Sequence, residues 1–337
     1  MFTLKKNKML PIFGANVPKG ALEKIPYINF IPKDGRVISL LPFFDGIAGT
    51  FRVLVPQDDG SILLVPGKPV QGPYYAMTIV EEGNDLHSQL IEYITLSLSF
   101  QSTVNILGGI ERDIINCSSV VEKYFIFLNL FRSTKDPMIA NLVLTDVEFL
   151  FANIRSLYDS IQVMIGDILG KVDKTKPHLP DSFYDMVKLE ETDQLKKYSL
   201  SQPLRKFYSE TKEFFLACRT IRTGFQHRRV DIPIILCLDE GFALTKDNTF
   251  LKDPVVARFN IWPQEKNKNG LVSLLGLIAY LNKTVLWHMD LLTEALKAAI
   301  PALPLISNDF GVFFRGPHIQ HLNLSNKYQI EQWIPPK

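Results

Sequence analysis

Apolar residues recur with two different periods along this chain, and the period changes between its middle and its ends. In the middle they recur every three or four positions, which predicts amphipathic helices. Towards both ends, short β-branched apolar runs flank Asp-Gly and Glu-Gly turns, which predicts β-hairpins. The pattern therefore predicts an α+β protein with a central antiparallel helical bundle flanked by β-hairpin elements.

The predicted helices in the middle of the chain begin at two patterns typical of helix starts. Ser119 to Glu122 and Thr145 to Glu148 each have the form of a capping box, in which a hydroxyl and a carboxylate satisfy free amides of the first turn. The first helix is expected to end before Pro137 and the second at Gly170. Two further helices are predicted over 181–189 and from residue 201 to near residue 224.

Hairpins are predicted where two apolar runs enclose a turn. One comprises residues 50–56 and 61–66, and the other comprises residues 231–238 and 242–245. Strands are also predicted over 255–262, 311–315 and 318–324, and a long apolar helix over 271–300. Residues 83–107 fit both a helix and a strand, with a helix favoured to about residue 102.

These elements suggest a division of the chain into three parts. Residues 1–110 are expected to form an extended arm and a β-hairpin region, and residues 111–230 the helical bundle. Residues 231–337 are expected to contribute a hairpin, the long helix and a tail packed with the N-terminal region.

Composition limits the functions that this fold can have. The chain has 337 residues, of which 46% are hydrophobic and 21% are charged, as in an ordinary globular protein. The net charge of +2 excludes a global field that drives binding to nucleic acid, so any polyanion site must be a local patch. Cys117, Cys218 and Cys237 are widely spaced, which favours reduced, buried thiols and a cytoplasmic location.

Neither a signal peptide nor a membrane segment is expected from the apolar runs. The basic start of the chain is followed by a stretch that Pro11, Gly14 and Pro18 interrupt, unlike a signal peptide. The run from Val272 to Leu281 is too short to span a bilayer. We therefore expect no membrane partner.

The strongest candidate for chemistry lies at the end of the helix that begins at residue 201. Arg222 and His227 are followed directly by Arg228 and Arg229, and Arg219 lies one turn before Arg222. An arginine supplies a fixed positive charge and a histidine supplies a group that titrates near neutral pH. Together they could act on one phosphodiester.

This arrangement, a helical segment ending in Arg-x4-His, resembles the HEPN superfamily, and the resemblance covers roughly a third of the chain. It implies metal-independent RNA cleavage by a homodimer in which two copies of the motif share a cleft. His227 would then be the catalytic acid–base group and Arg222 the catalytic group that holds the phosphate. Arg219, Arg228 and Arg229 would bind RNA, with no metal and no cofactor. Thr223 departs from the Asn, Asp or His that follows the arginine in many catalytic members, which favours the fold over catalysis.

Geometry leaves alternatives open at this motif. Five positions along a continuous helix separate two side chains by about 140°. The pairing therefore requires a break at Gly224 or a second copy of the chain. Basic residues also gather at helix C-termini simply because of the helix dipole. The competing hypothesis is a non-catalytic binding or scaffold protein that docks a protein or nucleic-acid partner through some of its 23 phenylalanines.

Other titratable residues favour structural roles. Asp167, Asp173 and His178 match no metal-ligand spacing. His288 on the long apolar helix is typical of a core or interface histidine. Arg155 and Asp159 are spaced for an ion pair, and their helix could also line a cleft.

Overall fold

The computed structural model describes residues 29–33, 36–44, 51–56, 62–67, 74–78, 86–98, 101–175, 177–227, 234–245, 271–300 and 310–314. The chain divides into two compact units. Unit 1 comprises Met1–Leu107 with Ile300–Ile319, and unit 2 comprises Gly108–Ala299 with Gln320–Lys337. Each unit is described by itself.

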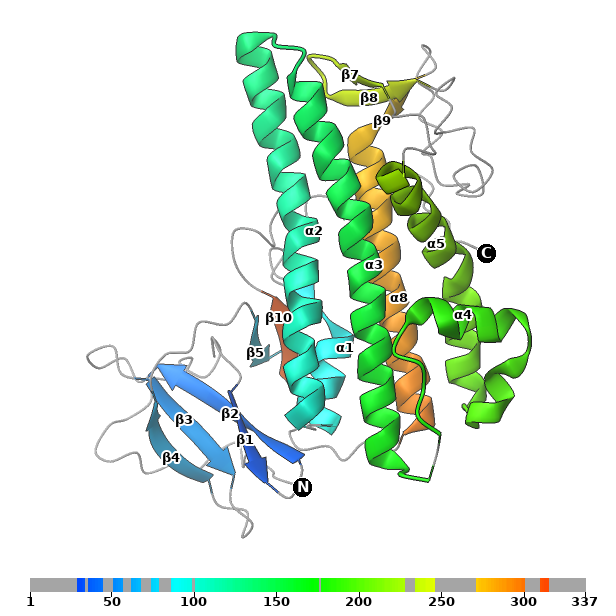
Figure 1. The fold of residues 1–337 in the computed structure, drawn as a ribbon. Coiled ribbons are helices and arrows are strands. Elements are labelled where there is room, and N and C mark those ends of the chain that lie inside the picture. Colours follow the sequence, from blue (N-terminus) through cyan, green and yellow to red (C-terminus); the bar gives the residue numbers. More distant parts are fainter. Residues whose placement is uncertain are drawn as a thin grey trace. The chain divides into compact units, whose positions relative to one another are not determined.

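Unit 1 contains two antiparallel sheets. The first has the order β1-β2-β3-β4, from β1 (Asn29–Lys33), β2 (Arg36–Phe44), β3 (Phe51–Pro56) and β4 (Ile62–Gly67) (Figure 1). The second has the order β5-β10-β6, in which β10 (Phe310–Phe314) lies between β5 (Tyr74–Thr78) and β6 (Leu86–His87). Residues from the C-terminal part of the chain thus complete a sheet of the N-terminal part.

A short helical segment follows β6 in unit 1. It consists of α1 (Gln89–Glu92) and the π-helical η2 (Tyr93–Leu98), and Ser88 caps α1 by accepting a hydrogen bond from the Ile91 amide. The Tyr93 hydroxyl donates to the Ile300 carbonyl over 3.0 Å. This bond ties the helical segment to the residue at which the chain re-enters unit 1.

Long helices make up most of unit 2. These are α2 (Gln101–Thr134), whose residues up to Leu107 belong to unit 1, α3 (Ile139–Val172), α5 (Gln202–His227) and α8 (Leu274–Ala299) (Figure 1). The shorter α4 (Phe183–Glu191) and the 3₁₀ helix η3 (Gln194–Tyr198) connect α3 to α5. Polar contacts between α2 and α3, such as that between Asn116 and Asn153 at 3.1 Å, fix the antiparallel register of these two helices.

The core of unit 2 is rich in aromatic side chains that the helical periodicity places on inward faces. Tyr158 of α3 lies at its centre, with ring centroids 4.9 Å from Phe183 and 5.4 Å from Phe215. Such edge and tilted contacts contribute roughly 0.5–1.5 kcal/mol beyond the area that they bury. Tyr208 is also fully buried and donates to Gln162 over 2.7 Å, so its hydroxyl is satisfied.

The third antiparallel sheet packs at one end of unit 2. It has the order β7-β8-β9, from β7 (Ile235–Cys237), β8 (Phe242–Thr245) and β9 (Leu271–Ser273). The Tyr124 hydroxyl of α2 accepts the Phe242 amide over 3.1 Å. A Cβ atom on Gly241 would lie only 2.5 Å from that hydroxyl oxygen, so the turn requires glycine there.

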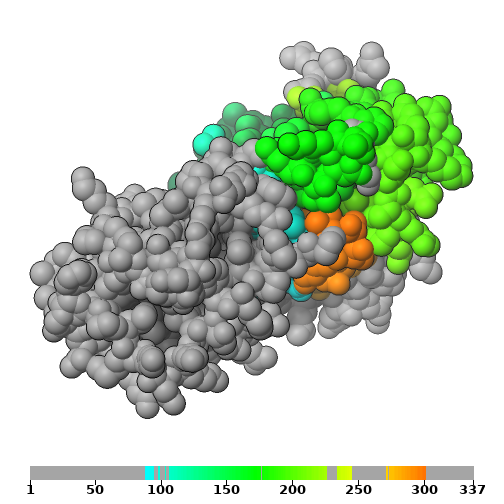
Figure 2. All heavy atoms as spheres, turned by 90° about the horizontal axis from the view of Figure 1, so that it is seen from below, coloured from blue at the N-terminus to red at the C-terminus, as the bar shows by residue number. Residues whose placement is uncertain are grey.

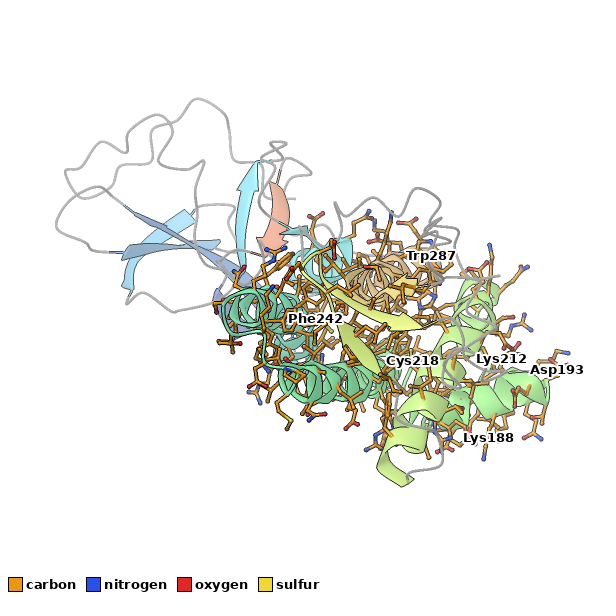
Figure 3. The ribbon with its side chains drawn as sticks, turned by 90° about the horizontal axis from the view of Figure 1, so that it is seen from above. Lys188, Asp193, Lys212, Cys218, Phe242 and Trp287 are labelled. Atoms are coloured by element: carbon orange, nitrogen blue, oxygen red, sulfur yellow. The ribbon has the colours of Figure 1, made fainter. Side chains whose placement is uncertain are left out.

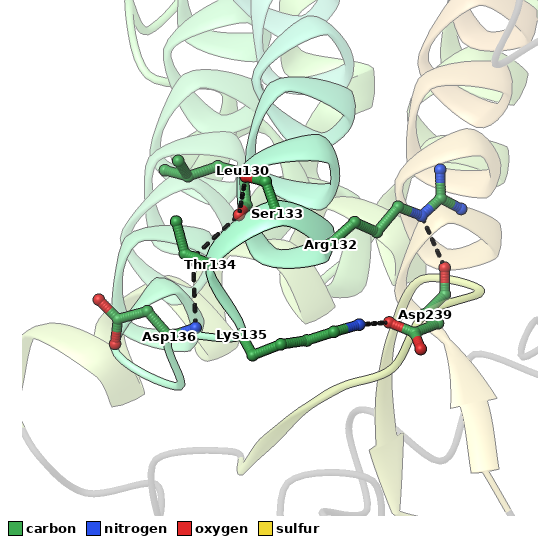
Figure 4. Close-up of polar contacts among 7 residues, drawn as sticks. All are labelled: Leu130, Arg132, Ser133, Thr134, Lys135, Asp136 and Asp239. Atoms are coloured by element: carbon green, nitrogen blue, oxygen red, sulfur yellow. Dashed lines mark hydrogen bonds and ion pairs between the residues drawn. The ribbon is translucent and has the colours of Figure 1, made fainter.

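Basic side chains at the end of α2 hold the turn between β7 and β8. Arg132 donates from Nε to the Asp239 carbonyl over 2.8 Å, and the Lys135 ammonium pairs with the Asp239 carboxylate (Figure 4). Asp239 lies in the turn of the predicted hairpin and is exposed, and its interactions with α2 were not apparent from sequence spacing.

The described residues form a mainly helical protein with antiparallel sheets, in agreement with the predicted α+β class. The pairings β3–β4 and β7–β8 confirm both predicted hairpins. Helices over the predicted ranges 181–189 and 271–300 are confirmed as α4 and α8, except that residues 271–273 form strand β9, and the strand near residue 311 is confirmed as β10. The predicted strands over 255–262 and 318–324 lie outside the described residues, as does most of the predicted N-terminal arm.

Both predicted capping boxes are wrong. Ser119 and Thr145 lie inside α2 and α3, where their hydroxyls donate to the carbonyls of Ile115 and Asn141, four residues earlier. A bond to the carbonyl four residues earlier satisfies a hydroxyl in a helix interior. Serine and threonine therefore fit a helix interior as well as a helix start.

The units also divide the chain differently from the three expected parts. The first boundary, expected at residue 110, falls near residue 107. Residues 231–299, expected to form part of a third region, belong with the helices of unit 2.

Candidate functional site

Helix α5 carries the residues of the Arg-x4-His motif, and it is longer than expected. It continues through the buried Gly224 to His227 instead of ending near Gly224. A glycine costs about 1 kcal/mol in a helix interior, which is not enough to end a helix that packing holds. Phe225 packs on Phe151 of α3 with ring centroids 6.2 Å apart, which fastens the last turns of α5.

Continuity of α5 separates the two predicted catalytic residues. Arg222 and His227 lie five positions apart on one continuous helix, and positions with this spacing are about 140° apart around a helix axis. The backbone of His227 ends the helix, and its side chain lies outside what the structure describes. Arg228 and Arg229, predicted to bind RNA, lie outside the described residues altogether. The break at Gly224 that would bring Arg222 and His227 together does not occur.

Arg222 instead lies near two other arginines. Arg219 precedes it by one helical turn, and Arg155 approaches from the neighbouring helix α3. Partial burial of Arg222, together with the charges of Arg155 and Arg219, lowers the pKa of the Arg222 guanidinium. The group remains protonated at neutral pH, so three positive charges are held close together here. We call Arg155, Arg219 and Arg222 the arginine cluster.

Two donor atoms of these guanidinium groups lack an acceptor among the described residues. The Nε atoms of Arg219 and Arg222 are buried and have no hydrogen-bond partner. Arg155 faces Asp159 one turn along α3, but its Nε lies 3.8 Å from the carboxylate, beyond hydrogen-bond distance. The arginine cluster is therefore not a closed network of ion pairs.

An aromatic residue on α4 fixes the position of Arg219. The Arg219 guanidinium lies 3.6 Å from the centroid of the Tyr184 ring, a cation–π contact. The Lys188 ammonium lies 4.4 Å from the same centroid. Figure 2 shows the end of unit 2 where α3 leads into α4; there the green side chains of the α3–α4 segment adjoin those of α5. Lys188 and Lys212 lie at the periphery of the helices, whereas Cys218 lies among them (Figure 3).

Asp159 connects the arginine cluster to α4. Its Oδ1 accepts the Phe183 amide at the start of α4 over 3.1 Å, and its Oδ2 faces Arg155. A carboxylate at this position stabilises a helix N-terminus through its free amides and dipole. Asp159 therefore orients the helix that carries Tyr184. The sequence indicated the Arg155–Asp159 pair but gave no signal for Tyr184 beyond its i, i+4 spacing to Lys188.

A buried polar pair, Tyr158 and His288, lies in the core of unit 2. His288 of α8 is 1% exposed and its Nδ1 shares a short hydrogen bond with the Tyr158 hydroxyl. Burial lowers the pKa of His288 to about 3 and raises the pKa of Tyr158. The prediction of a core histidine is confirmed. The neutral, enclosed imidazole links α8 to α3 through its hydrogen bond with Tyr158.

The cysteines also agree with their predicted role. Cys117 and Cys218 are buried and Cys237 is partly buried, and all are free thiols. Burial raises the pKa of Cys117 to about 12, so this thiol is unreactive. Among the described residues, no group of three or more His, Cys, Asp or Glu side chains could hold a metal ion.

An apolar strip is exposed on α2 and α3. Its side chains are between 41% and 54% exposed and comprise Ile126, Leu130, Leu142 and Phe149. Lys123, paired with Asp146, lies 5.7 Å from the centroid of the Phe149 ring. Most phenylalanines named above are core residues, so the protein-partner hypothesis now depends on this strip and not on the number of phenylalanines.

Residues 106–134 of α2 also have the length and apolar composition of a helix that could cross a membrane, a criterion that core helices of soluble proteins meet too. The apolar run from Val272 to Leu281, which was judged too short to span a bilayer, lies outside α2.

No family model, curated protein or solved structure matches the chain. The resemblance to HEPN proteins therefore rests only on the motif and its helical setting.

Proposed function

We propose that this protein binds RNA through the arginine cluster, with the long helices of unit 2 acting as a helical bundle that presents it. The observation that carries the proposal is the proximity of three guanidinium groups from α3 and α5 that face one carboxylate, Asp159, in the part of the chain that the structure describes. Arginine suits this function because its planar fork of donors matches the oxygens of a phosphate group.

Partial burial strengthens the case for an anionic ligand. Unneutralised charges in a partly desolvated position repel one another, and this repulsion is relieved when an anion binds. A purely structural role would pair each guanidinium with a protein acceptor, and the Nε atoms of Arg219 and Arg222 have none. The resemblance to HEPN proteins favours RNA among the possible polyanions.

Fluorescence anisotropy with a short single-stranded RNA tests this proposal. Arg222→Gln should weaken binding by about tenfold or more, because a charge-assisted contact contributes roughly 1.5–3 kcal/mol. Lys206→Gln is the matched control, since Lys206 lies on the same helix, is 71% exposed and pairs with Glu210. Equal weakening by both changes would show a general charge effect and would contradict a site at the arginine cluster.

A ribonuclease is the second candidate, and the geometry of α5 defines the form that it must take. Because positions 222 and 227 lie on different sides of one continuous helix, a cleavage site that uses both residues would combine Arg222 of one copy with His227 of another. This hypothesis requires a homodimer, as the resemblance implied. It requires no metal, so cleavage should persist in EDTA.

Mixing two inactive variants tests this composite site. Arg222→Gln and His227→Gln should each abolish cleavage of single-stranded RNA in EDTA, and their equimolar mixture should regain part of the wild-type rate. The regain arises because a mixed dimer retains one site with both native residues. If the wild type cleaves but the mixture does not, the two residues act within one copy. If the wild type binds RNA without cleaving it, the protein is a binding protein only.

A further inference from the structure

The charge balance of the arginine cluster indicates which part of an RNA strand it recognises. Among the described residues, the cluster has three guanidinium groups and one facing carboxylate, that of Asp159, which together leave two positive charges. The Lys188 ammonium, which shares the Tyr184 ring with Arg219, adds to this excess. Asp159 is also engaged by the Phe183 amide at 3.1 Å, so its carboxylate does not neutralise Arg155 fully.

The two kinds of phosphate in an RNA strand differ in charge. An internal phosphodiester carries one negative charge, whereas a terminal phosphomonoester carries about 1.5 to 2 at neutral pH and has one more terminal oxygen that can accept hydrogen bonds. A site with an excess of at least two positive charges matches the terminal group better than an internal one. An internal diester would leave one positive charge of a partly buried cluster unmatched.

The position of Arg219 further favours a compact, highly charged group. The Tyr184 ring holds the Arg219 guanidinium at 3.6 Å, and Asp159 fixes the N-terminus of the helix that carries Tyr184. Arg219 and Arg222 are one turn apart on α5, and Arg155 of α3 is close enough for its charge to act on Arg222. Donors fixed before binding lose little conformational freedom when they close on one anion.

We propose that the arginine cluster, with Arg219 held by Tyr184, binds the terminal phosphomonoester group of an RNA strand. The inference rests on the RNA binding proposed above and specifies the end of the strand as the group recognised. Arg155 and Arg222 contact the phosphate oxygens, and Tyr184 is a positioning residue that acts through Arg219.

Three RNAs of one sequence with an internal fluorophore test the inference. One carries a 5′-phosphate, one a 3′-phosphate, and one has hydroxyl groups at both ends. The wild-type protein should bind one of the phosphorylated strands about tenfold more tightly than the hydroxyl-ended strand, a ratio that we call the terminal-phosphate preference. Arg155→Gln and Arg222→Gln should reduce this preference to about one.

Variants at Asp159 and Tyr184 distinguish recognition from folding. Asp159→Asn keeps an acceptor for the Phe183 amide but removes the competing charge, so it should increase affinity for the phosphorylated strand. Tyr184→Leu should reduce the terminal-phosphate preference, and Lys196→Gln, at an exposed ion pair with Asp193, should leave it unchanged. Circular dichroism of each variant shows whether its fold is intact.

The outcomes separate this inference from the proposed function. Equal and measurable affinity for all three RNAs overturns the terminal-phosphate inference and leaves RNA binding in place. Absence of binding to any of the RNAs overturns both. A wild-type preference that Arg155→Gln and Arg222→Gln leave intact, with the variants folded, places the phosphate elsewhere and also overturns the inference.

Discussion

Acid should destabilise unit 2 through one residue, His288. This imidazole is fully enclosed and pairs with the Tyr158 hydroxyl, and burial lowers its pKa to about 3 from the usual 6.5. Because the unfolded chain then binds the extra proton, stability is complete above about pH 6.5 and falls as the pH decreases towards 3. Between about pH 7.5 and pH 5 the loss through this residue is roughly 2 kcal/mol.

Two carboxyl groups of unit 2 oppose this effect in the wild type. Burial raises the pKa of Glu111 to about 7 and that of Asp113 to about 6. Groups with a raised pKa contribute stability that is complete below their unfolded-state pKa and is lost as the pH rises through the folded-state value. A pH profile of the wild type alone therefore mixes opposite contributions, and a comparison with a variant is needed.

Urea unfolding of the wild type and His288→Gln over a series of pH values isolates the histidine. The glutamine removes the titrating group and keeps a polar side chain near Tyr158. The difference in unfolding free energy between the two proteins should shrink by roughly 2 kcal/mol on acidification from about pH 7.5 to pH 5. A difference that stays constant with pH would show that the imidazole titrates alike in both states, which refutes the reasoning from burial.

Two further predictions concern packing in unit 2. Gly241→Ala should destabilise the protein by about 1–3 kcal/mol, because the new Cβ would lie 2.5 Å from the Tyr124 hydroxyl oxygen. Adding Tyr124→Phe removes that clash as well as the bond to the Phe242 amide, so the two changes should be non-additive in thermal unfolding; simple additivity argues against the clash. Tyr208→Phe should cost about 1–3 kcal/mol because it leaves the Gln162 oxygen buried without its donor, and an unchanged melting temperature would contradict this.

The sequence predicted the helices better than their ends. Apolar periodicity reports which face of a helix is buried, and it identified α4, α5 and α8 correctly. It could not place the start of α2, because the capping pattern at Ser119 is equally compatible with a hydroxyl that bonds to the preceding turn. The end of α5 was predicted too early, near Gly224, because the tertiary packing of Phe225 outweighs the weak helix propensity of one glycine.

The candidate site was predicted in part, for a reason of geometry. Local spacing identified Arg219 and Arg222 and paired Arg155 with Asp159, since residues one turn apart are neighbours on a helix. That Arg155 approaches Arg222 depends on how α3 packs on α5, and the stacking of Tyr184 on Arg219 depends on α4. Such contacts between helices leave no periodic signal in one sequence. Of the two ways in which Arg222 and His227 could pair, the continuous α5 excludes the one that requires a break at Gly224, and pairing across two copies stays a hypothesis.

The most direct test of the account is the salt dependence of RNA binding by the wild type and Arg222→Gln. Each phosphate contact on single-stranded RNA contributes about 0.7 to the slope of log affinity against log salt concentration. The account predicts that Arg222→Gln lowers the magnitude of this slope by about that amount, with Lys206→Gln unchanged. Identical slopes for the wild type and Arg222→Gln would mean that Arg222 contacts no phosphate, which contradicts the arginine cluster as the RNA site.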